Sequence, residues 1–197
     1  MRLFVAAEVP ETWRAIASAA VEAVARTSQV PMRIVHPSLL HITLRFLGEV
    51  AEERLPALDA ALAHRVPPVD VALTLGPPST FGPPPRTQVV WLGVRGDIEG
   101  LRGVVRRVDL ALGDAGVEPN DRRFAPHLTL ARLDRRVTAE ERRLVAEVVA
   151  AMPPPEPFPL RVRTVALVRS TLGGPRPVYD VLRRYGTGGQ AEDLPGF

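Results

Sequence analysis

Two short strings in this sequence pair a histidine with a threonine in the same pattern. His41-Ile42-Thr43-Leu44 returns 86 residues later as His127-Leu128-Thr129-Leu130. In a β-strand, alternate side chains point to opposite faces, so each histidine shares one face with its threonine while the apolar residues share the other. Each string therefore predicts a strand that buries its apolar face and presents an imidazole beside a hydroxyl.

Two imidazoles that face one cleft suit an in-line displacement at phosphorus. The ordinary pKa of histidine is about 6.5, so a neutral ring can accept a proton from water while a protonated ring donates one to the leaving oxygen. Threonine hydroxyls can donate hydrogen bonds to phosphate oxygens as charge develops there. The alternative interpretation is a polar outer face of an antiparallel sheet, with threonine present for its strand propensity. The second copy of the string favours the shared site.

The composition excludes several other chemistries. The chain has no cysteine, so it has no thiolate nucleophile, no disulfide and no cysteine-ligated metal. The two histidines have no nearby set of carboxylates that would complete a zinc site, and no glycine-rich phosphate loop is present. We therefore expect neither a metal ion nor another cofactor.

The spacing of apolar residues predicts the elements that must position the two strings. Strands are expected at 2–7, 41–46, 69–75, 88–94, within 124–133, at 160–168 and at 178–185. Helices are expected at 10–25, 52–63, 98–112 and 138–152, and a capping box at Thr138-Ala139-Glu140-Glu141 opens the last of them. Gly76-Pro77-Pro78 should end the strand expected at 69–75. The mixture of adjoining strands and helices predicts an α+β fold with a largely antiparallel sheet.

The length and charge limit the size and the partners of the protein. The chain has 197 residues, of which 46% are hydrophobic, and we expect one bilobal domain at 1–186 with a mobile tail at 187–197. No apolar run approaches the roughly 20 residues of a membrane span, and the N-terminus has no signal-peptide pattern. We therefore expect a cytoplasmic protein, and since no protein partner is implied, a monomer. The net charge is only +3, so this is not a polybasic protein that coats DNA.

The twin strings resemble the signature of the two-histidine (2H) phosphoesterase superfamily. Within it, the chain is similar to the RNA 2′,3′-cyclic phosphodiesterases, also called 2′-5′ RNA ligases. The segments that carry the resemblance lie at 2–6, 41–50, 86–94 and 123–132. The resemblance implies two pseudo-symmetric lobes with outer helices, whose two sheets line a V-shaped cleft with one string on each side.

The activity implied by the resemblance is hydrolysis of a 2′,3′-cyclic phosphate at an RNA end to a 2′-phosphate. His41 and His127 would be the acid–base pair, with Thr43 and Thr129 as phosphate ligands. We assign His41 as the acid and His127 as the base, and the sequence leaves the reverse assignment open. Arg132 would offset the phosphate charge. By strict alternation it points away from Thr129, so it needs a bulge or the strand end to reach the cleft.

Three further residues are candidate RNA contacts. Phe124 could stack on the terminal base or pack in the core, and Arg123 could bind a phosphate or remain a surface charge. Arg45 shares the parity of His41 and Thr43 and could face the cleft. His36 and His64 are placed outside the site, and Trp91 in the core. Where the family often has a tryptophan and an asparagine before the first histidine, this chain has Ile34 and Leu39.

Other functions remain open on the same residues. One is 2′-5′ RNA ligation, and another is a phosphodiesterase activity on another small cyclic nucleotide. A third is a module that binds RNA ends without catalysis. The sequence distinguishes these only weakly, through the presence of both histidines.

Overall fold

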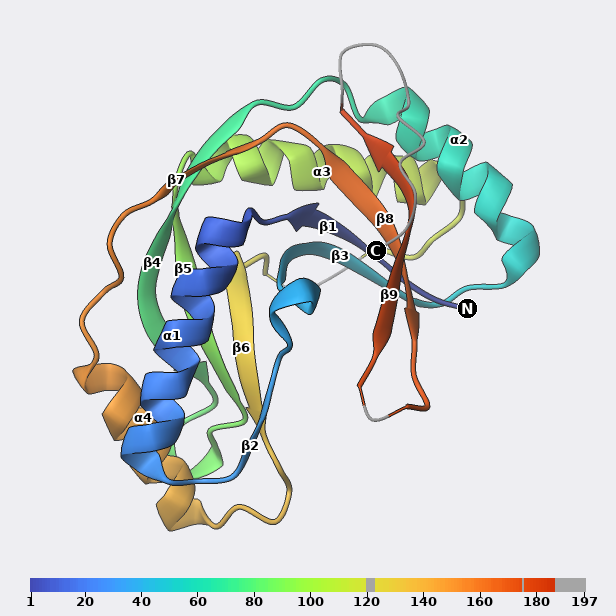
Figure 1. Cartoon of the computed structure of the whole chain (residues 1–197). Helices are drawn as coiled ribbons and strands as arrows, with labels where there is room; N and C mark the ends of the chain where they lie inside the picture. The colour runs from blue at the N-terminus through green and yellow to red at the C-terminus, as the bar shows by residue number, and fades with distance from the viewer. Residues whose placement is uncertain (120–122, 175, 187–197) are drawn as a thin grey trace.

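The computed structural model describes residues 1–119, 123–174 and 176–186, and the predicted tail at 187–197 lies outside them (Figure 1). In this part of the chain, four α-helices and nine strands form an α+β fold, as predicted. The helices are α1 (Glu11–Ser28), α2 (Leu55–Arg65), α3 (Ile98–Asp114) and α4 (Ala139–Ala151). The strands are β1 (Arg2–Glu8), β2 (Met32–Ile34), β3 (His41–Glu49), β4 (Val71–Phe81), β5 (Val89–Gly96), β6 (His127–Leu133), β7 (Pro159–Val162), β8 (Val165–Thr171) and β9 (Val178–Tyr185).

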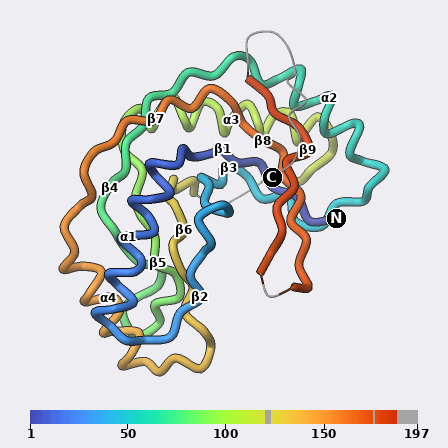
Figure 2. The backbone as a smooth tube through the Cα atoms, in the orientation of Figure 1, coloured from blue at the N-terminus to red at the C-terminus, as the bar shows by residue number. Residues whose placement is uncertain are grey.

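The strands form one curved sheet (Figure 2). Every pairing between the described strands is antiparallel. Its order is β7-β4-β5-β6-β3-β1-β8-β9, and β2 pairs with β6 outside this path. The two strands that carry the histidines lie side by side at the middle. They are joined there by a single residue pair, Ile42 with Leu128. The resemblance implied two separate sheets, whereas this pair connects the two half-sheets into one.

Each half of the sheet has its own pair of helices, which confirms the prediction of two lobes. The helices α1 and α4 pack against each other and against β6 and β4. The helices α2 and α3 pack against each other and against β9 and β3, and α3 also contacts β4 of the other half. The chain crosses from one half of the sheet to the other in the same way twice. β1 is followed by a helix on the other half, α1, and β5 is followed by a helix on the other half, α3.

Apolar residues at strand and helix spacing form the main core between the sheet and the helices. In β1, Leu3, Val5 and Ala7 are fully buried against it. The inner face of α3 also lies in this core, as its predicted spacing requires. The predicted capping box is present at α4, where the Thr138 side chain accepts from the amide of Glu141 and the Glu141 side chain accepts from the amide of Thr138. These contacts fix the start of the helix.

Two predicted strands are wrong, while the ends of most other elements shift by one to three residues. β4 does not end at Gly76 but continues through Pro77 and Pro78 to Phe81, because a register shift between Leu75 and Pro78 relieves the prolines of donating to the ladder. The predicted strand at 160–168 is two strands. β7 pairs with β4 in one half and β8 pairs with β1 in the other, so the chain must cross between the halves at 163–164.

Candidate active site

The two histidine strands share a bulge directly after the threonine. Opposite β3, the register shifts so that Val5 pairs with Arg45 and Ala6 with Thr43. Opposite β6, Val90 pairs with Ala131 and Trp91 with Thr129. Each bulge adds one residue to its strand and so reverses the alternation of the side chains beyond it. The sequence of buried and exposed side chains over the first seven residues is consequently the same in both strands.

The two strands place their histidines and threonines on one cavity of about 790 Å³. His41, Thr43 and Phe46 of β3 line it together with their counterparts His127, Thr129 and Arg132 of β6. The remaining walls come from β1, from β2 and the turn that follows it, and from the β8–β9 hairpin: Arg2, Phe4, Arg33, Ile34, Val35, His36, Pro37, Leu39, Ser170, Leu172, Arg176, Pro177 and Tyr179. Both imidazoles thus open onto one shared space, as the sequence predicts.

A backbone contact fixes the proton-carrying nitrogen of each imidazole. Nδ1 of His41 lies 2.7 Å from the carbonyl oxygen of Leu39, and Nδ1 of His127 lies 2.7 Å from the carbonyl oxygen of Ala125. A carbonyl oxygen can only accept, so Nδ1 carries the hydrogen in both rings. Nε2 is therefore the nitrogen of each ring that is left to exchange a proton with a ligand.

Aromatic side chains hold both imidazoles in place. His41 stacks on Phe4 with 4.8 Å between ring centroids and meets Tyr179 edge-on at 5.4 Å. His127 meets Phe81 edge-on at 4.8 Å and Trp91 at 5.9 Å. Ring contacts on two sides restrict rotation of the imidazole and remove water from its faces. The two rings are therefore oriented before a ligand binds.

Burial also sets the charge of the two rings. It is the main cause that lowers the pKa of His41 and of His127, since desolvation disfavours the charged form. The hydrogen bond to the backbone carbonyl partly opposes this in each ring, while the positive charge of Arg132 lowers both pKa values. A proton on His127 further lowers the pKa of His41. The unliganded site thus favours neutral imidazoles, and a bound anion would favour the protonated ones.

The cavity is cationic. Four arginines and three histidines line it, and none of its lining residues is a carboxylate. Arg33 is paired with Asp134 at 3.3 Å. Arg2, Arg132 and Arg176 have no ion pair within the part of the chain that the structure describes. Positive charge without a protein counterion suits a phosphate ligand.

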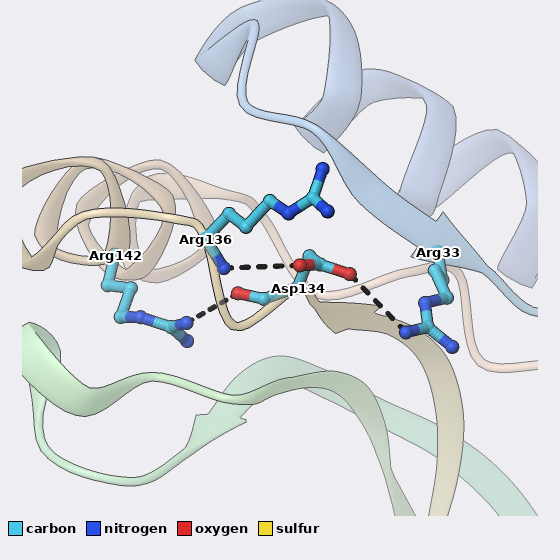
Figure 3. A network of polar contacts seen from close by, with 4 residues as sticks. All are labelled: Arg33, Asp134, Arg136 and Arg142. Carbon is cyan, nitrogen blue, oxygen red and sulfur yellow. Dashed lines mark hydrogen bonds and ion pairs between the residues drawn. The ribbon is translucent and has the colours of Figure 1, made fainter.

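Asp134 follows the last residue of β6 and binds three arginines (Figure 3). Its carboxylate accepts from the guanidinium of Arg33 and, at 3.1 Å, from the amide of Arg136. Its carbonyl oxygen accepts from Arg142 of α4 at 2.6 Å. The network ties β2, β6 and α4 together at this wall of the cavity, which keeps the strand end that carries Arg132 in position.

The bulges decide which predicted contacts reach the cavity. Arg132 was expected to reach the cleft through a bulge or at the strand end; the bulge is present, and Arg132 lines the cavity. The prediction that Arg45 faces the cleft is wrong, because the same bulge in β3 turns it to the opposite face. There it is only 7% exposed, lies 3.1 Å from the Asp109 carboxylate and donates to the carbonyl oxygen of Glu118. Phe124 packs against the main core instead of lining the cavity, and Arg123 is exposed outside it.

Several cavity residues were not identified from the sequence. His36, which was placed outside the site, lines the cavity, as do Ile34 and Leu39. Phe46 also lines the cavity and is 58% exposed, whereas the stacking role was predicted for Phe124. The bulge invoked for Arg132 predicts Phe46 as well if it is applied to the first string. Nothing in the sequence pattern marks Tyr179, because it comes from the distant strand β9.

Two further observations concern ligands and location. Among the described residues, no group of three or more histidine, aspartate or glutamate side chains is placed to hold a metal ion. None of the helices in the described ranges is long and apolar enough to cross a membrane.

The structure is a bilobal antiparallel sheet in which each half contributes one His-x-Thr strand to a shared cavity. The resemblance to two-histidine phosphoesterases implies this arrangement. A sequence model of the "2′-5′ RNA ligase superfamily" matches residues 10–174. The chain therefore belongs to this superfamily.

Curated relatives and solved structures agree with this assignment. An RNA 2′,3′-cyclic phosphodiesterase from Thermus thermophilus is 36% identical over 96% of this chain and 92% of its own. One from Aeropyrum pernix is 34% identical over 78% of this chain and 85% of its own. A crystal structure of a Thermus thermophilus protein aligns with a TM-score of 0.73 at 28% identity, covering 94% of this chain and 97% of that one. Escherichia coli LigT complexed with 3′-AMP aligns with a TM-score of 0.70 at 28% identity and covers 98% of both chains.

Proposed function

We propose that this protein hydrolyses the 2′,3′-cyclic phosphate at an RNA end to a 2′-phosphate by two-histidine acid–base catalysis that needs no metal ion. The observation that carries the proposal is the placement of His41 and His127 on one cavity with Nδ1 of each ring bonded to the backbone. The names of the relatives support the substrate class, since several are RNA 2′,3′-cyclic phosphodiesterases. LigT has been solved with 3′-AMP and with phosphate, which supports a nucleotide phosphate as the occupant.

In the proposed reaction, one histidine removes a proton from the attacking water and the other gives a proton to the leaving oxygen. Nε2 of His127, neutral, takes a proton from water as the water oxygen forms a bond to phosphorus. The bond between phosphorus and O3′ breaks, and Nε2 of His41, protonated, gives its proton to O3′. The products are a 2′-phosphate and a free 3′-hydroxyl, and the two rings exchange protonation states. Proton return through solvent restores the starting form.

The remaining cavity residues stabilise the phosphate during this step. The hydroxyls of Thr43 and Thr129 donate to its non-bridging oxygens from the two sides of the cavity. Arg132 supplies a guanidinium that can donate two hydrogen bonds to the same group. These donors gain most where negative charge builds up in the transition state. Phe46 offers its exposed ring to the base of the terminal nucleotide.

The charge balance of the site fits this assignment. Lowered pKa values favour neutral imidazoles without a ligand, so His127 is already in the form that can act as the base. The phosphate brings negative charge into the cavity, which raises the pKa of the ring that must act as the acid. One copy of the chain carries both histidines, so a monomer is sufficient for the reaction. The cytoplasmic location stays a prediction from the sequence.

The test is incubation with an oligonucleotide that ends in a 2′,3′-cyclic phosphate, with and without EDTA. We expect a 2′-phosphate as the product in both conditions. His41→Ala and His127→Ala should each lower turnover by about 10²-fold or more, the scale of general acid–base catalysis. A 3′-phosphate product or full turnover in either variant would contradict the proposal, and binding without turnover would favour a module that only binds RNA ends.

The family model favours one second candidate, 2′-5′ RNA ligation. In that reaction a 5′-hydroxyl would replace water as the nucleophile, and the same two imidazoles would exchange the same protons. Adding an oligonucleotide with a free 5′-hydroxyl to the assay separates the two reactions. A joined product with a 2′-5′ linkage would show ligation, whereas the 2′-phosphate alone would show hydrolysis.

A further inference from the structure

A second, smaller cavity of about 340 Å³ adjoins the catalytic cavity. Six residues line both: Phe4, Leu39, His41, Arg176, Pro177 and Tyr179. The imidazole of His41 and the ring of Tyr179 therefore form a common wall between the two spaces. The two cavities are therefore direct neighbours on either side of these residues.

The floor of the smaller cavity is apolar and separate from the main core. Phe4 and Ala6 of β1 and Val168 of β8 are buried there in a cluster of their own, with Val181 of β9 packed against it. At the rim, Val178 is 56% exposed. An apolar floor of this kind suits a ribose or the face of a nucleobase, which binds by stacking and burial without a required sequence.

The smaller cavity is lined by cationic groups that have no ion pair among the described residues. Arg14 of α1 has a buried Nε without a hydrogen-bond partner, and its guanidinium has no ion pair within the described ranges. Arg176 lies at the boundary of the two cavities and is also without an ion pair there. The one carboxylate of the lining belongs to Glu8, and it accepts from Arg184 at 2.7 and 2.9 Å. The charge of Glu8 is thus balanced, and that of Arg14 is not.

We propose that this smaller cavity is the subsite for the nucleotide that precedes the cyclic end, with its ribose or base on the apolar floor and its phosphodiester held by Arg14 and Arg176. The proposal rests on the proposed function, since it takes the catalytic cavity to hold the cyclic phosphate. A guanidinium without a counterion is a fitting donor for a phosphodiester oxygen. The cavity therefore makes the protein an enzyme for oligonucleotide ends rather than for free cyclic nucleotides.

The experiment compares two substrates with the same reacting end. One is adenosine 2′,3′-cyclic phosphate, and the other is a trinucleotide that ends in the same group. We expect the wild-type kcat/KM to be higher for the trinucleotide by about 10-fold or more, given the strength of charge-assisted hydrogen bonds to phosphate. Its kcat/KM should also fall more steeply with salt, with a logarithmic slope larger by about 0.7 for one additional neutralised phosphate.

Arg14→Gln is the decisive variant, because Arg14 lines only the smaller cavity. It should lower kcat/KM for the trinucleotide by about 5- to 20-fold, while cyclic nucleotide turnover in the same preparation reports that the catalytic cavity is folded. Arg107→Gln is the matched control. It removes an exposed arginine from α3 that lines neither cavity, and both substrates should keep their wild-type values.

Each other outcome overturns part of the account. An equal loss on both substrates would assign the smaller cavity to the terminal nucleotide itself, and no loss on either would remove Arg14 from recognition. If the wild-type protein hydrolyses neither substrate, the proposed function fails first. Binding of a labelled trinucleotide with a 2′-phosphate then tests the subsite alone, and equal affinity of the wild type and Arg14→Gln would overturn it as well.

Discussion

Phe46 and Arg132 occupy equivalent positions in the two halves of the sheet. Each lies five residues beyond the histidine of its strand, follows the same bulge and lines the cavity that holds both histidines. Strict alternation would have turned both side chains away from the histidines. The bulge thus gives one half an aromatic ring and the other half a cation, so two similar strands make an asymmetric site.

Replacing Phe46 should weaken recognition of the RNA end without weakening the fold. The ring is 58% exposed, so Phe46→Ala removes little buried surface. Loss of stacking on a base should cost about 1–3 kcal/mol of binding, seen as a rise in KM. Leu110→Ala is the control, because Leu110 is exposed to a similar degree at 57% on α3. An unchanged KM for Phe46→Ala would exclude a stacking role.

Arg132 should affect both the rate and its pH dependence. Arg132→Gln removes a phosphate donor and should lower kcat by about 10²-fold, while Arg132→Lys should recover part of it, because lysine keeps the charge but loses the planar fork. Arg132 also lowers the pKa of both histidines. In Arg132→Gln the pH profile of kcat/KM should therefore move toward higher pH. A profile that stays in place would mean that Arg132 does not act on the imidazoles.

The pH–rate profile of the wild type should be a bell displaced to the acidic side. Both imidazole pKa values lie below the ordinary 6.5 in the free protein. Activity is lost as the pH falls through the pKa of the base and as it rises through the pKa of the acid. Bound phosphate raises both values. The optimum of kcat, which reports the complex, should accordingly lie at higher pH than that of kcat/KM, and the opposite order would contradict the assigned charges.

A substrate with a different leaving group can show which histidine is the acid and which is the base. A nitrophenolate ion leaves without protonation, so a nitrophenyl phosphodiester of a nucleotide needs a base but no acid. His41→Ala should lose much less activity on this substrate than on the cyclic phosphate, by about 10-fold or more. His127→Ala should be impaired to a similar degree on both substrates. The reverse result would exchange the two roles.

Arg45 should matter for stability and not for substrate. It is nearly buried and forms an ion pair with Asp109 at 3.1 Å on the helix side of the sheet. Arg45→Ala would leave the Asp109 carboxylate, which is half-exposed, without its partner, and should lower the free energy of unfolding by about 1–3 kcal/mol. Urea unfolding measures this loss. A rise in KM of the folded variant would instead support the contact with RNA that the sequence suggested.

Much of the fold and the chemical centre could be predicted from the sequence because both depend on local pattern. The strand, the shared face of His41 and Thr43, and the matching pair His127 and Thr129 follow from alternation alone. The capping box at Thr138 is likewise a local signal. A bulge or the strand end was expected to bring Arg132 to the cleft, and the structure has the bulge. The same reasoning was not applied to β3. Arg45 was consequently placed on the wrong face.

The sequence by itself determined which side chains form the proposed site: two imidazoles and two hydroxyls, with each histidine and its threonine on one strand face. Only the tertiary structure decided what surrounds them. Tyr179 reaches His41 from the hairpin of β8 and β9, and Arg14 reaches the second cavity from α1. Such contacts join residues far apart in the chain, and they depend on sheet order and helix packing, which no local periodicity encodes.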